Sequence, residues 1–132
     1  PPEVNMLNEK NNGETVLKII KNDLVNSVHD VSGGGLLVSL AEMSINSGYG
    51  IKINKPKKLS NLLEYFFGED QGRYVLEIDN DNLEEVDKIF KNNNIFYENI
   101  GFTQKEFFEI KDEMKINIIE LSKINNQWYN NF

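Results

Sequence analysis

The chain has 132 residues, of which 39% are hydrophobic and 27% are charged, with 21 acidic against 14 basic side chains. A length of this order suits one domain with a core of its own. The formal net charge of −7 argues against a general nucleic-acid binder, which needs a basic stripe. It also argues against docking on an anionic membrane, so neither nucleic acid nor membrane is an expected partner.

Missing residue types exclude several kinds of site. The chain has no cysteine and one histidine, His29, which rules out disulfides, thiolate catalysis and histidine-cluster metal sites. No apolar run approaches the ~20 residues of a membrane-spanning helix. The first residues are not a signal peptide, because they lack a basic start and an apolar stretch. We therefore expect a cytoplasmic protein, and the start without Met suggests a piece of a longer chain.

Apolar spacing and turn residues predict alternating helices and strands. Residues 1–12 are polar and led by proline, and we expect an extended linker there, followed by one domain over 13–132. The predicted helices and strands, in chain order, are helix 13–22, strand 24–31, helix 36–46, strand 49–53, helix 59–67, strand 73–78, helix 83–90, strand 95–100, strand 106–110, strand 115–118 and helix 119–132. This order predicts a single mixed α/β (α+β) domain, with helices packed on a mixed sheet.

Some local features refine this prediction. Ser60 lies near the start of one helix, and Asp81 with Glu84 resembles a capping box at the start of another. We expect Phe107, Phe108 and Trp128 to lie in the core or at a domain contact, since the acidic balance disfavours base stacking on nucleic acid.

The first segment that could carry chemistry runs from Val28 to Leu36 and contains Ser32, Gly33, Gly34 and Gly35. Three glycines after a strand allow positive φ angles and close approach to a ligand. The following helix start exposes free N–H groups and a partial positive charge, which suits phosphate. The spacing matches neither a Walker A loop nor a dinucleotide fingerprint. The alternative is a tight turn with a helix capped by Asp30 or Ser32 and no ligand.

His29 and Asp30 invite an acid–base interpretation, because imidazole can transfer protons near neutral pH. Neighbours on a strand point to opposite faces, however, so the two side chains are not automatically a pair. The alternative is a structural histidine at the end of a strand.

The second segment runs from Phe67 to Val75 and gathers Glu69, Asp70, Gln71 and Arg73 in a turn before a core strand. Its carboxylates could hold Mg²⁺ and its arginine could pair with phosphate. The alternative is a polar turn closed by an ordinary surface salt bridge.

Together, the two segments resemble the phosphoribosylformylglycinamidine synthase (PurL) family, in its short bacterial form. The resemblance rests on the segment 28–36 with Ala41-Glu42-Met43, on the segment 68–75, on the N-terminal residues and on Leu121 and Trp128 near the end. It covers essentially the whole chain. One departure is Gly33, where the family commonly has Asp; three glycines are more similar to aminoimidazole ribonucleotide synthase. A missing carboxylate argues against a cation in this loop.

The resemblance implies an α/β C-terminal domain, partly ferredoxin-like, packed beside an ATP-binding domain in a chain that carries this two-domain unit twice. The family converts formylglycinamide ribonucleotide, ATP and glutamine-derived ammonia to formylglycinamidine ribonucleotide. The implied cofactors of the parent enzyme are ATP and Mg²⁺. The implied partners are upstream domains of the same chain, a glutaminase subunit and a small accessory subunit.

By the same resemblance, the catalytic histidine and the Mg²⁺ ligands lie in earlier domains, so no catalytic residue and no metal ligand is expected here. The implied role is structural, at an auxiliary nucleotide or phosphate cleft, and the fragment alone is expected to be inactive. The residues expected to line this cleft are His29, Asp30, Ser32, Gly33, Gly34, Gly35, Glu69, Gln71 and Arg73. The alternatives are the C-terminal domain of another superfamily enzyme and a non-catalytic ferredoxin-like ligand-binding module.

Overall fold

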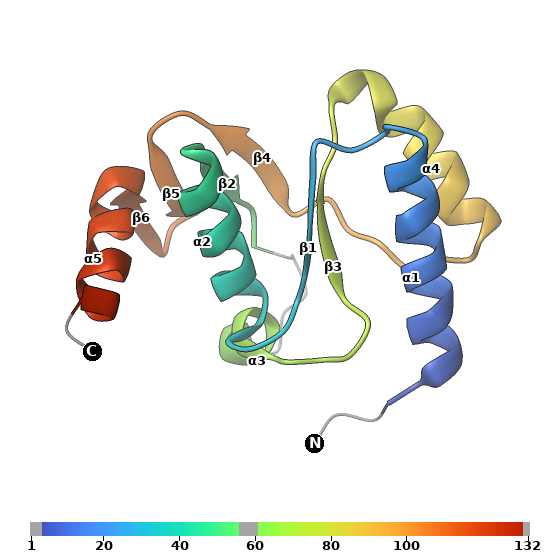
Figure 1. Ribbon diagram of the computed structural model, residues 1–132, viewed down its shortest axis with the longest axis horizontal. Coiled ribbons are helices and arrows are strands. Elements are labelled where there is room, and N and C mark those ends of the chain that lie inside the picture. The colour runs from blue at the N-terminus through green and yellow to red at the C-terminus, as the bar shows by residue number, and fades with distance from the viewer. Residues whose placement is uncertain (1–3, 56–60, 131–132) are drawn as a thin grey trace. The chain divides into compact units, whose positions relative to one another are not determined.

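The computed structural model describes residues 4–55 and 61–130 of the chain (Figure 1). The helices are α1 (Met6–Lys21), α2 (Gly35–Ser47), α3 (Leu62–Phe67), α4 (Leu83–Asn92) and α5 (Ile118–Asn130), with a 3₁₀ turn η1 (Asn80–Asn82). The strands are β1 (Ser27–Asp30), β2 (Gly50–Ile53), β3 (Tyr74–Glu77), β4 (Gly101–Gln104), β5 (Phe107–Ile110) and β6 (Met114–Asn117). The order of helices and strands follows the sequence prediction, and the mixed α/β class is confirmed.

The chain forms two compact units, and it passes between them within α2, within α3 and between Glu98 and Asn99. The first unit comprises the residues up to Ser39 together with Phe66–Glu98. The second comprises Leu40–Tyr65 and the residues from Asn99 onward. The strands are divided accordingly between a two-stranded and a four-stranded sheet.

In the first unit, β1 pairs antiparallel with β3, with Ser27 opposite Glu77 and Asp30 opposite Tyr74. Helices α1 and α4 lie side by side (Figure 1). A core cluster is formed by buried residues of α1, of the segment after it and of α4, namely Ile19, Leu24, Val86 and Phe90. The partly buried Leu76 of β3 packs against this cluster. Since burial of such side chains is the main favourable term in folding, this cluster fixes the ladder relative to both helices.

Helix α1 begins at Met6, so the prediction of an extended linker over residues 1–12 is wrong for residues 6–12. Asn5 caps the helix with an extended backbone and a side chain that accepts from the Asn8 N–H at 3.1 Å. Gly13, where we expected the helix to start, lies inside it, and a Cβ there would lie 3.3 Å from the Tyr74 hydroxyl. The glycine therefore marks a close helix–strand approach instead of a boundary.

Helix α4 does not have the predicted capping box. Asp81 lies inside the 3₁₀ turn η1, and Asn82 is the N-cap without a side-chain cap bond. The backbone of Asn82 already has helical angles, whereas a capping side chain needs an extended N-cap. Glu84 instead accepts a hydrogen bond from Lys88 at 2.7 Å.

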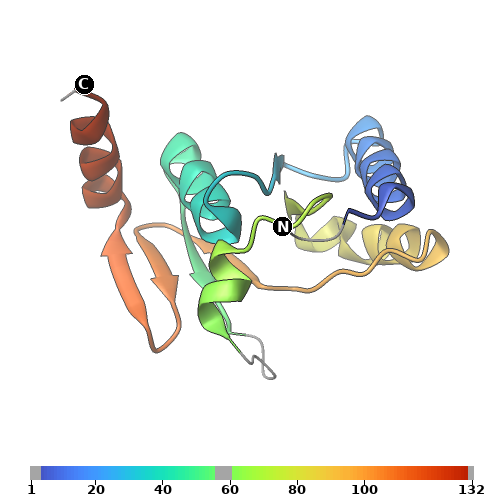
Figure 2. The same ribbon diagram turned by 90° about the horizontal axis from the view of Figure 1, so that it is seen from below.

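In the second unit, the four strands have the order β4-β2-β5-β6. β2 is parallel to β5, and the other neighbouring pairs are antiparallel, so the sheet is mixed. Helix α5 follows directly after β6 and contacts it (Figure 2). Ile53, Phe108 and Ile110 are buried; Phe108 thus lies in the core, as predicted.

Alternation along the strands places charged residues on the other face of this sheet. Glu109 lies between Lys52, at 3.0 Å, and Lys115, at 3.9 Å. The hydrogen bond from Lys52 holds the pKa of Glu109 below its usual value. The ammonium of Lys115 also lies 4.1 Å from the centre of the Phe107 ring.

The predicted strand over 95–100 is wrong, and the strand begins at Gly101 instead. Asn94 has a positive φ, and the Ile95 N–H donates to the Phe90 carbonyl, so these residues complete the end of α4. Tyr97 then packs on Phe90, with ring centres 4.8 Å apart. Both contacts tie this segment to α4 and leave β4 to pair with β2.

Two further predictions concern the ends of helices. Ser60 lies outside the described residues, and the side chain of Asn61 accepts hydrogen bonds from the Leu63 and Glu64 N–H groups at the start of α3. The side chain of Trp128 on α5 is 60% exposed, so it does not lie in a core of this chain. A domain contact at Trp128 stays a prediction.

Candidate functional site

The pairing of β1 with β3 brings the two motif segments together in the first unit. The glycine loop follows the end of β1, and the polar turn precedes the start of β3. Because the strands are antiparallel, these two ends lie at the same end of the ladder. The Val31 N–H donates to the Arg73 carbonyl at 2.9 Å and extends the pairing into both segments.

A hollow of about 330 Å³ lies where the two segments meet. Its lining includes predicted residues from both segments: Asp30, Ser32, Gly33, Glu69, Gln71 and Arg73. The other lining residues are Glu9, Val31, Gly72 and Tyr74. His29, Gly34 and Gly35 were also predicted, and they belong to the same segment but do not line the hollow.

Two of the three glycines are required by the backbone of the loop. Gly34 and Gly35 have φ angles of 83° and 72°, which side chains other than glycine rarely adopt. A Cβ on Gly35 would lie 2.7 Å from backbone atoms of Phe67, just before the polar turn. Gly33 differs, because a Cβ there would meet nothing within 4 Å. A residue with a side chain therefore fits at position 33.

The predicted phosphate position already holds a protein carboxylate. Gly34 donates its N–H to Oε1 of Glu69 at 2.7 Å. Gly35 donates its N–H to the carbonyl of Ser32 at 3.0 Å, which closes the turn. Neither Asp30 nor Ser32 is needed as the cap we had considered, because Glu69 supplies the acceptor from the other motif.

His29 contacts its neighbour, not the hollow. Its Nδ1 lies 2.6 Å from the backbone carbonyl oxygen of Asp30 and 3.8 Å from the carboxylate of Asp30. The side chain of Asp30 is 70% exposed, and that of His29 only 24%. This geometry fits the structural alternative for the histidine.

Arg73 forms the salt bridge considered as the alternative for the polar turn. Its Nη1 donates to Oδ2 of Asp70 and to the carbonyl of Gly68, both at 3.2 Å. The guanidinium therefore closes its own turn. The bridge is partly exposed, so its contribution to stability is small.

Helix α1 supplies a wall of the hollow that the sequence prediction missed. Glu9 lines the hollow, and a Cβ on Gly72 would lie 3.1 Å from the Cα of Glu9. Asn12 donates its side-chain amide to the carbonyl of Gly72 at 3.0 Å. These contacts hold the polar turn against α1. Residues 6–12, which the sequence prediction assigned to a linker, form the first turns of α1.

The charges around the hollow are mainly negative. Glu9, Asp30 and Glu69 contribute carboxylates, whereas Arg73 contributes a guanidinium already paired with Asp70. Across the described ranges 4–55 and 61–130, no three histidine, aspartate or glutamate side chains gather closely enough to hold a metal ion.

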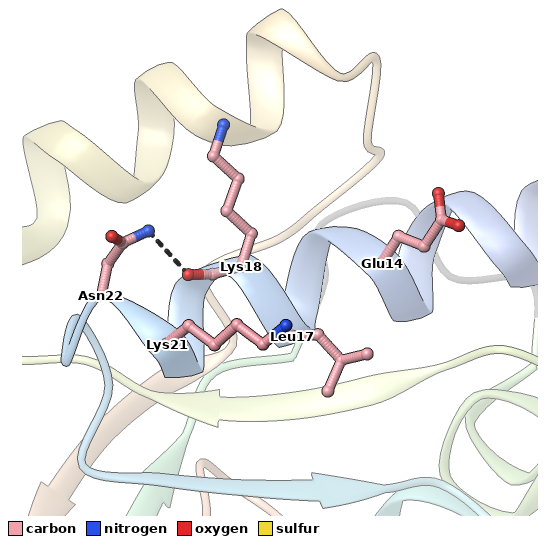
Figure 3. Close-up of a pocket in the computed structure, with 5 residues that line it drawn as sticks. All are labelled: Glu14, Leu17, Lys18, Lys21 and Asn22. Atoms are coloured by element: carbon pink, nitrogen blue, oxygen red, sulfur yellow. Dashed lines mark hydrogen bonds between the residues drawn. The ribbon is translucent and has the colours of Figure 1, made fainter.

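A second hollow, of about 420 Å³, lies on the C-terminal half of α1 and is lined by Glu14, Leu17, Lys18, Lys21 and Asn22. All five residues come from one helix and its cap. Figure 3 shows that the ends of Lys18 and Lys21 point in different directions. The hollow thus lacks the convergent polar groups of a binding site.

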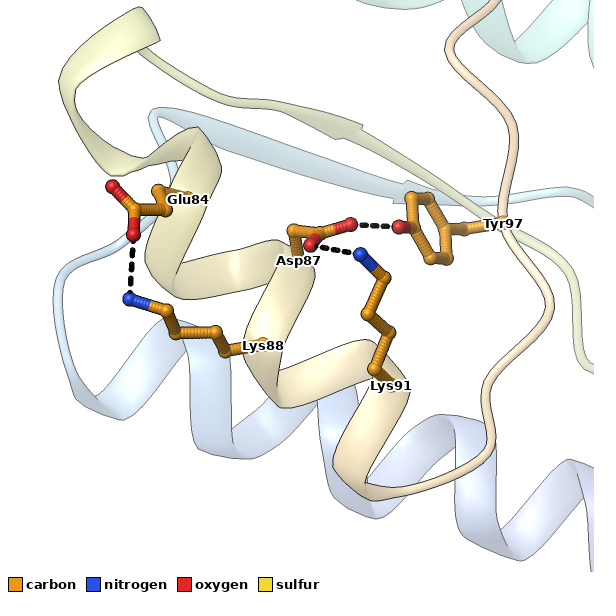
Figure 4. A network of polar contacts seen from close by, with 5 residues as sticks. All are labelled: Glu84, Asp87, Lys88, Lys91 and Tyr97. Carbon is orange, nitrogen blue, oxygen red and sulfur yellow. Dashed lines mark hydrogen bonds and ion pairs between the residues drawn. The ribbon is translucent and has the colours of Figure 1, made fainter.

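A second polar cluster lies on α4 (Figure 4). Hydrogen bonds from Lys88 and Lys91 lower the pKa values of Glu84 and Asp87. Tyr97 also donates to Asp87, and this bond raises the pKa of Tyr97. Perturbed groups can mark active sites, but these are pairs one helical turn apart on a surface, outside both hollows. We assign them to helix stability.

The sequence matches the family described as AIR synthase related protein, C-terminal domain, over residues 1–111. It is 42% identical, over all of its 132 residues, to the phosphoribosylformylglycinamidine synthase subunit PurL of Pelagibacter ubique, and covers 18% of that protein. It is 35% identical to PurL of Bartonella bacilliformis, again over 100% of this chain and 18% of the relative. The chain thus spans less than a fifth of the curated relatives it matches.

Solved structures share the fold. Phosphoribosylformylglycinamidine synthase II of Thermotoga maritima has a TM-score of 0.76 and 16% identity, over 92% of this chain and 22% of that one. The same bacterium's PurL complexed with FGAR has a TM-score of 0.73 and 18% identity, over 86% and 21%. Its PurLQS structure has a TM-score of 0.76 and 17% identity, over 91% and 22%. In the described part of this chain, no helix has the length and apolar character needed to cross a membrane.

Proposed function

Since the chain belongs to the family of AIR synthase related proteins, C-terminal domain, we propose that it is the C-terminal domain of an ATP-dependent phosphoribosylformylglycinamidine synthase. The reaction converts formylglycinamide ribonucleotide and glutamine-derived ammonia to formylglycinamidine ribonucleotide. The observation that carries this proposal is 42% identity to PurL of Pelagibacter ubique along the whole chain. The shared fold with the Thermotoga maritima synthase supports it.

The proposed ligands and partners belong to the parent chain. The Thermotoga maritima structure with FGAR supports the substrate class, and PurLQS supports an assembly with further subunits. We propose upstream domains, a glutaminase subunit and a small accessory subunit as partners, in the cytoplasm, with ATP and Mg²⁺ acting in the upstream domains.

We propose that this domain has a structural role and forms one wall of an auxiliary nucleotide cleft. We also propose that it contributes no catalytic residue. Two observations support the wall. The β1–β3 ladder gathers six of the predicted residues around one hollow. The loop N–H of Gly34 donates to the carboxylate of Glu69, and this bond supports an anion position at the loop. The pairing of His29 with Asp30 supports a structural histidine instead of a proton donor.

The test measures phosphate release from ATP by the full-length parent chain, with ammonia as nitrogen donor, with and without formylglycinamide ribonucleotide. We expect release that needs both the substrate and ammonia. A parent chain truncated before residue 1 is expected to lose this activity, because the domain completes the assembly. Absence of substrate-dependent release from the folded parent chain, supplied with Mg²⁺ and partner subunits, would refute the proposed activity.

A further inference from the structure

The chain has one asparagine that is followed by glycine, Asn12-Gly13, and this pair lies inside α1. An asparagine in this position can lose ammonia without an enzyme, because the backbone nitrogen of the next residue attacks its side-chain amide. Glycine favours the attack, since it has no Cβ to block the approach and allows many backbone conformations. Asn12 is therefore the most reactive asparagine of the chain wherever its backbone is free.

The reaction consumes water and releases ammonia. The Gly13 nitrogen bonds to Cγ of Asn12 and loses its proton, while the Cγ–Nδ2 bond breaks and Nδ2 leaves with that proton as ammonia. Water then opens the five-membered succinimide ring that has formed. Opening at Cγ gives aspartate, whereas opening at the backbone carbonyl gives isoaspartate, in which the main chain runs through the side-chain carbon. Nothing is oxidised or reduced.

Helix α1 holds Asn12 away from this reaction. A helical residue has a ψ near −42°, which a planar succinimide ring at the same residue does not allow. In a helix, each backbone N–H donates to the carbonyl four residues earlier, so the attacking nitrogen is engaged. The Asn12 side chain is engaged as well, because it donates to the Gly72 carbonyl at 3.0 Å. The reaction therefore requires that this part of α1 open first.

The first half of α1, residues 6–12, is held less firmly than the second half. None of residues 4–14 is buried. The ion pair between Lys10 and Glu14 spans Gly13, but both side chains are largely exposed, so it contributes little. Glycine inside a helix also weakens it relative to alanine, so the first half can separate at Gly13. The buried residues of α1 all follow this glycine, and they are Thr15, Val16 and Ile19.

Two asparagine amides tie the first half of α1 to the rest of the first unit. Asn12 donates to the Gly72 carbonyl at 3.0 Å, and Asn11 donates to the Asn93 carbonyl at 2.9 Å. Deamidation of Asn12 removes one of these donors. The product carboxylate would meet the Gly72 carbonyl oxygen as one acceptor facing another, so it cannot restore the bond. The modified chain therefore spends more of its time open.

We propose that Asn12 is a site of spontaneous deamidation, that local opening of residues 6–12 controls its rate, and that the product releases the first half of α1 from the polar turn. A hydrogen bond of this kind corresponds to a factor of about two to ten in an equilibrium constant. Removing the Asn11 bond should therefore speed deamidation at Asn12 by about that factor. The rate does not depend on the proposed activity, so failure of that activity is detected separately.

The experiment incubates the unchanged chain, Asn11→Ala and Asn22→Ala at mildly alkaline pH, both folded and in denaturing urea. Mass spectrometry of the peptide that contains residue 12 gives the rate. Asn22→Ala is the matched control, because it removes an asparagine bond at the other end of the same helix, to the Lys18 carbonyl at 2.8 Å. The rates in urea correct for any effect of the neighbouring side chain itself.

In the folded state, Asn12 should react about two- to tenfold faster in Asn11→Ala than in the unchanged chain, and at the unchanged rate in Asn22→Ala. All three chains should react faster in urea than when folded. Hydrogen exchange then tests the effect of the product. The amides of residues 10–13 should exchange faster in Asn12→Asp than in the unchanged chain, whereas those of Val16 and Ile19 should keep their protection.

Four outcomes would overturn the proposal. Equal rates in the folded chain and in urea would show that α1 does not protect Asn12. An unchanged rate in folded Asn11→Ala would show that the first half of α1 does not open as a unit. Equal acceleration in Asn22→Ala would assign the rate to unfolding of the whole helix. Unchanged hydrogen exchange in Asn12→Asp would show that the product does not release the first half.

Discussion

Replacing Gly35 by alanine should destabilise the chain, whereas the same change at Gly33 should not. Gly35 has a φ of 72°, which costs an alanine roughly 1–2 kcal/mol. Its new Cβ would lie 2.7 Å from backbone atoms of Phe67, well inside the ~3.5–4.0 Å of ordinary carbon contacts. Relieving such overlap adds about 1–3 kcal/mol. The expected loss for Gly35→Ala is therefore about 3 kcal/mol.

Gly33→Ala is the matched control, since it adds the same methyl group two residues away. Its Cβ would have nothing within 4 Å, and its backbone does not require a positive φ. Alanine also restricts the unfolded chain, so the expected change lies between zero and a gain of about 1 kcal/mol. Gly33→Asp, which restores the residue common in the family that this chain resembles, should be accommodated in the same way.

The assay is urea unfolding followed by far-ultraviolet circular dichroism. With a slope of about 1–3 kcal/mol per molar urea, a loss of about 3 kcal/mol lowers the midpoint by about 1–3 M. Equal midpoints for Gly35→Ala and the unchanged chain would refute the close approach of the glycine loop to Phe67. Equal losses for both alanine variants would refute the distinction between the two glycines.

Three further changes test other contacts. Asn12→Asp removes the donor to the Gly72 carbonyl and should cost about 1 kcal/mol in urea unfolding; unchanged stability would show that this bond does not hold the turn. Tyr97→Phe should raise the pKa of Asp87 in an NMR titration, yet leave it below its ordinary value because Lys91 remains the larger cause; no movement would refute the bond. Glu109→Gln should destabilise the chain at pH 7 but not at low pH. The folded-state pKa of Glu109 is depressed, so its stabilisation is present above the unfolded carboxyl value of about 4.3 and is lost as pH falls through the folded value. An equal difference at both pH values would contradict this.

Periodicity was sufficient to predict the order of the elements. The alternation along β3 and the apolar spacing of Val86 and Phe90 in α4 identify a strand and a helix without tertiary information. The segment 95–100 shows where this fails. Ile95 packs against the core cluster, and Tyr97 packs on Phe90. The apolar residues of this segment therefore pack against α4 and its core and do not form a strand. Apolar alternation does not reveal whether a pairing strand is present.

The candidate site was only partly predictable, for a related reason. Each motif was visible in the sequence as a run of glycines or polar residues. Their meeting depends on the pairing of Asp30 with Tyr74, which involves residues 44 positions apart. The bond from Gly34 to Glu69 depends in turn on that pairing. A single sequence shows which backbone and side-chain groups could bind an anion. It does not show that the carboxylate of Glu69 already accepts the hydrogen bond from the Gly34 N–H.

The sequence prediction missed the contribution of α1 to the hollow. The reason is that a glycine can mark either the end of a helix or a close approach between two segments. The sequence prediction began the helix at Gly13 and assigned the polar residues before it to a linker. In the structure Gly13 lies within α1, where the Tyr74 hydroxyl comes within 3.3 Å of a Cβ position. Gly72 is the counterpart on the turn, 3.1 Å from the Cα of Glu9. Both glycines let α1 approach β3 and the turn before it, so the polar start of α1 contributes Glu9 to the hollow. A glycine inside an otherwise helical polar stretch should therefore prompt a search for a second glycine that faces it, before the stretch is assigned to a linker.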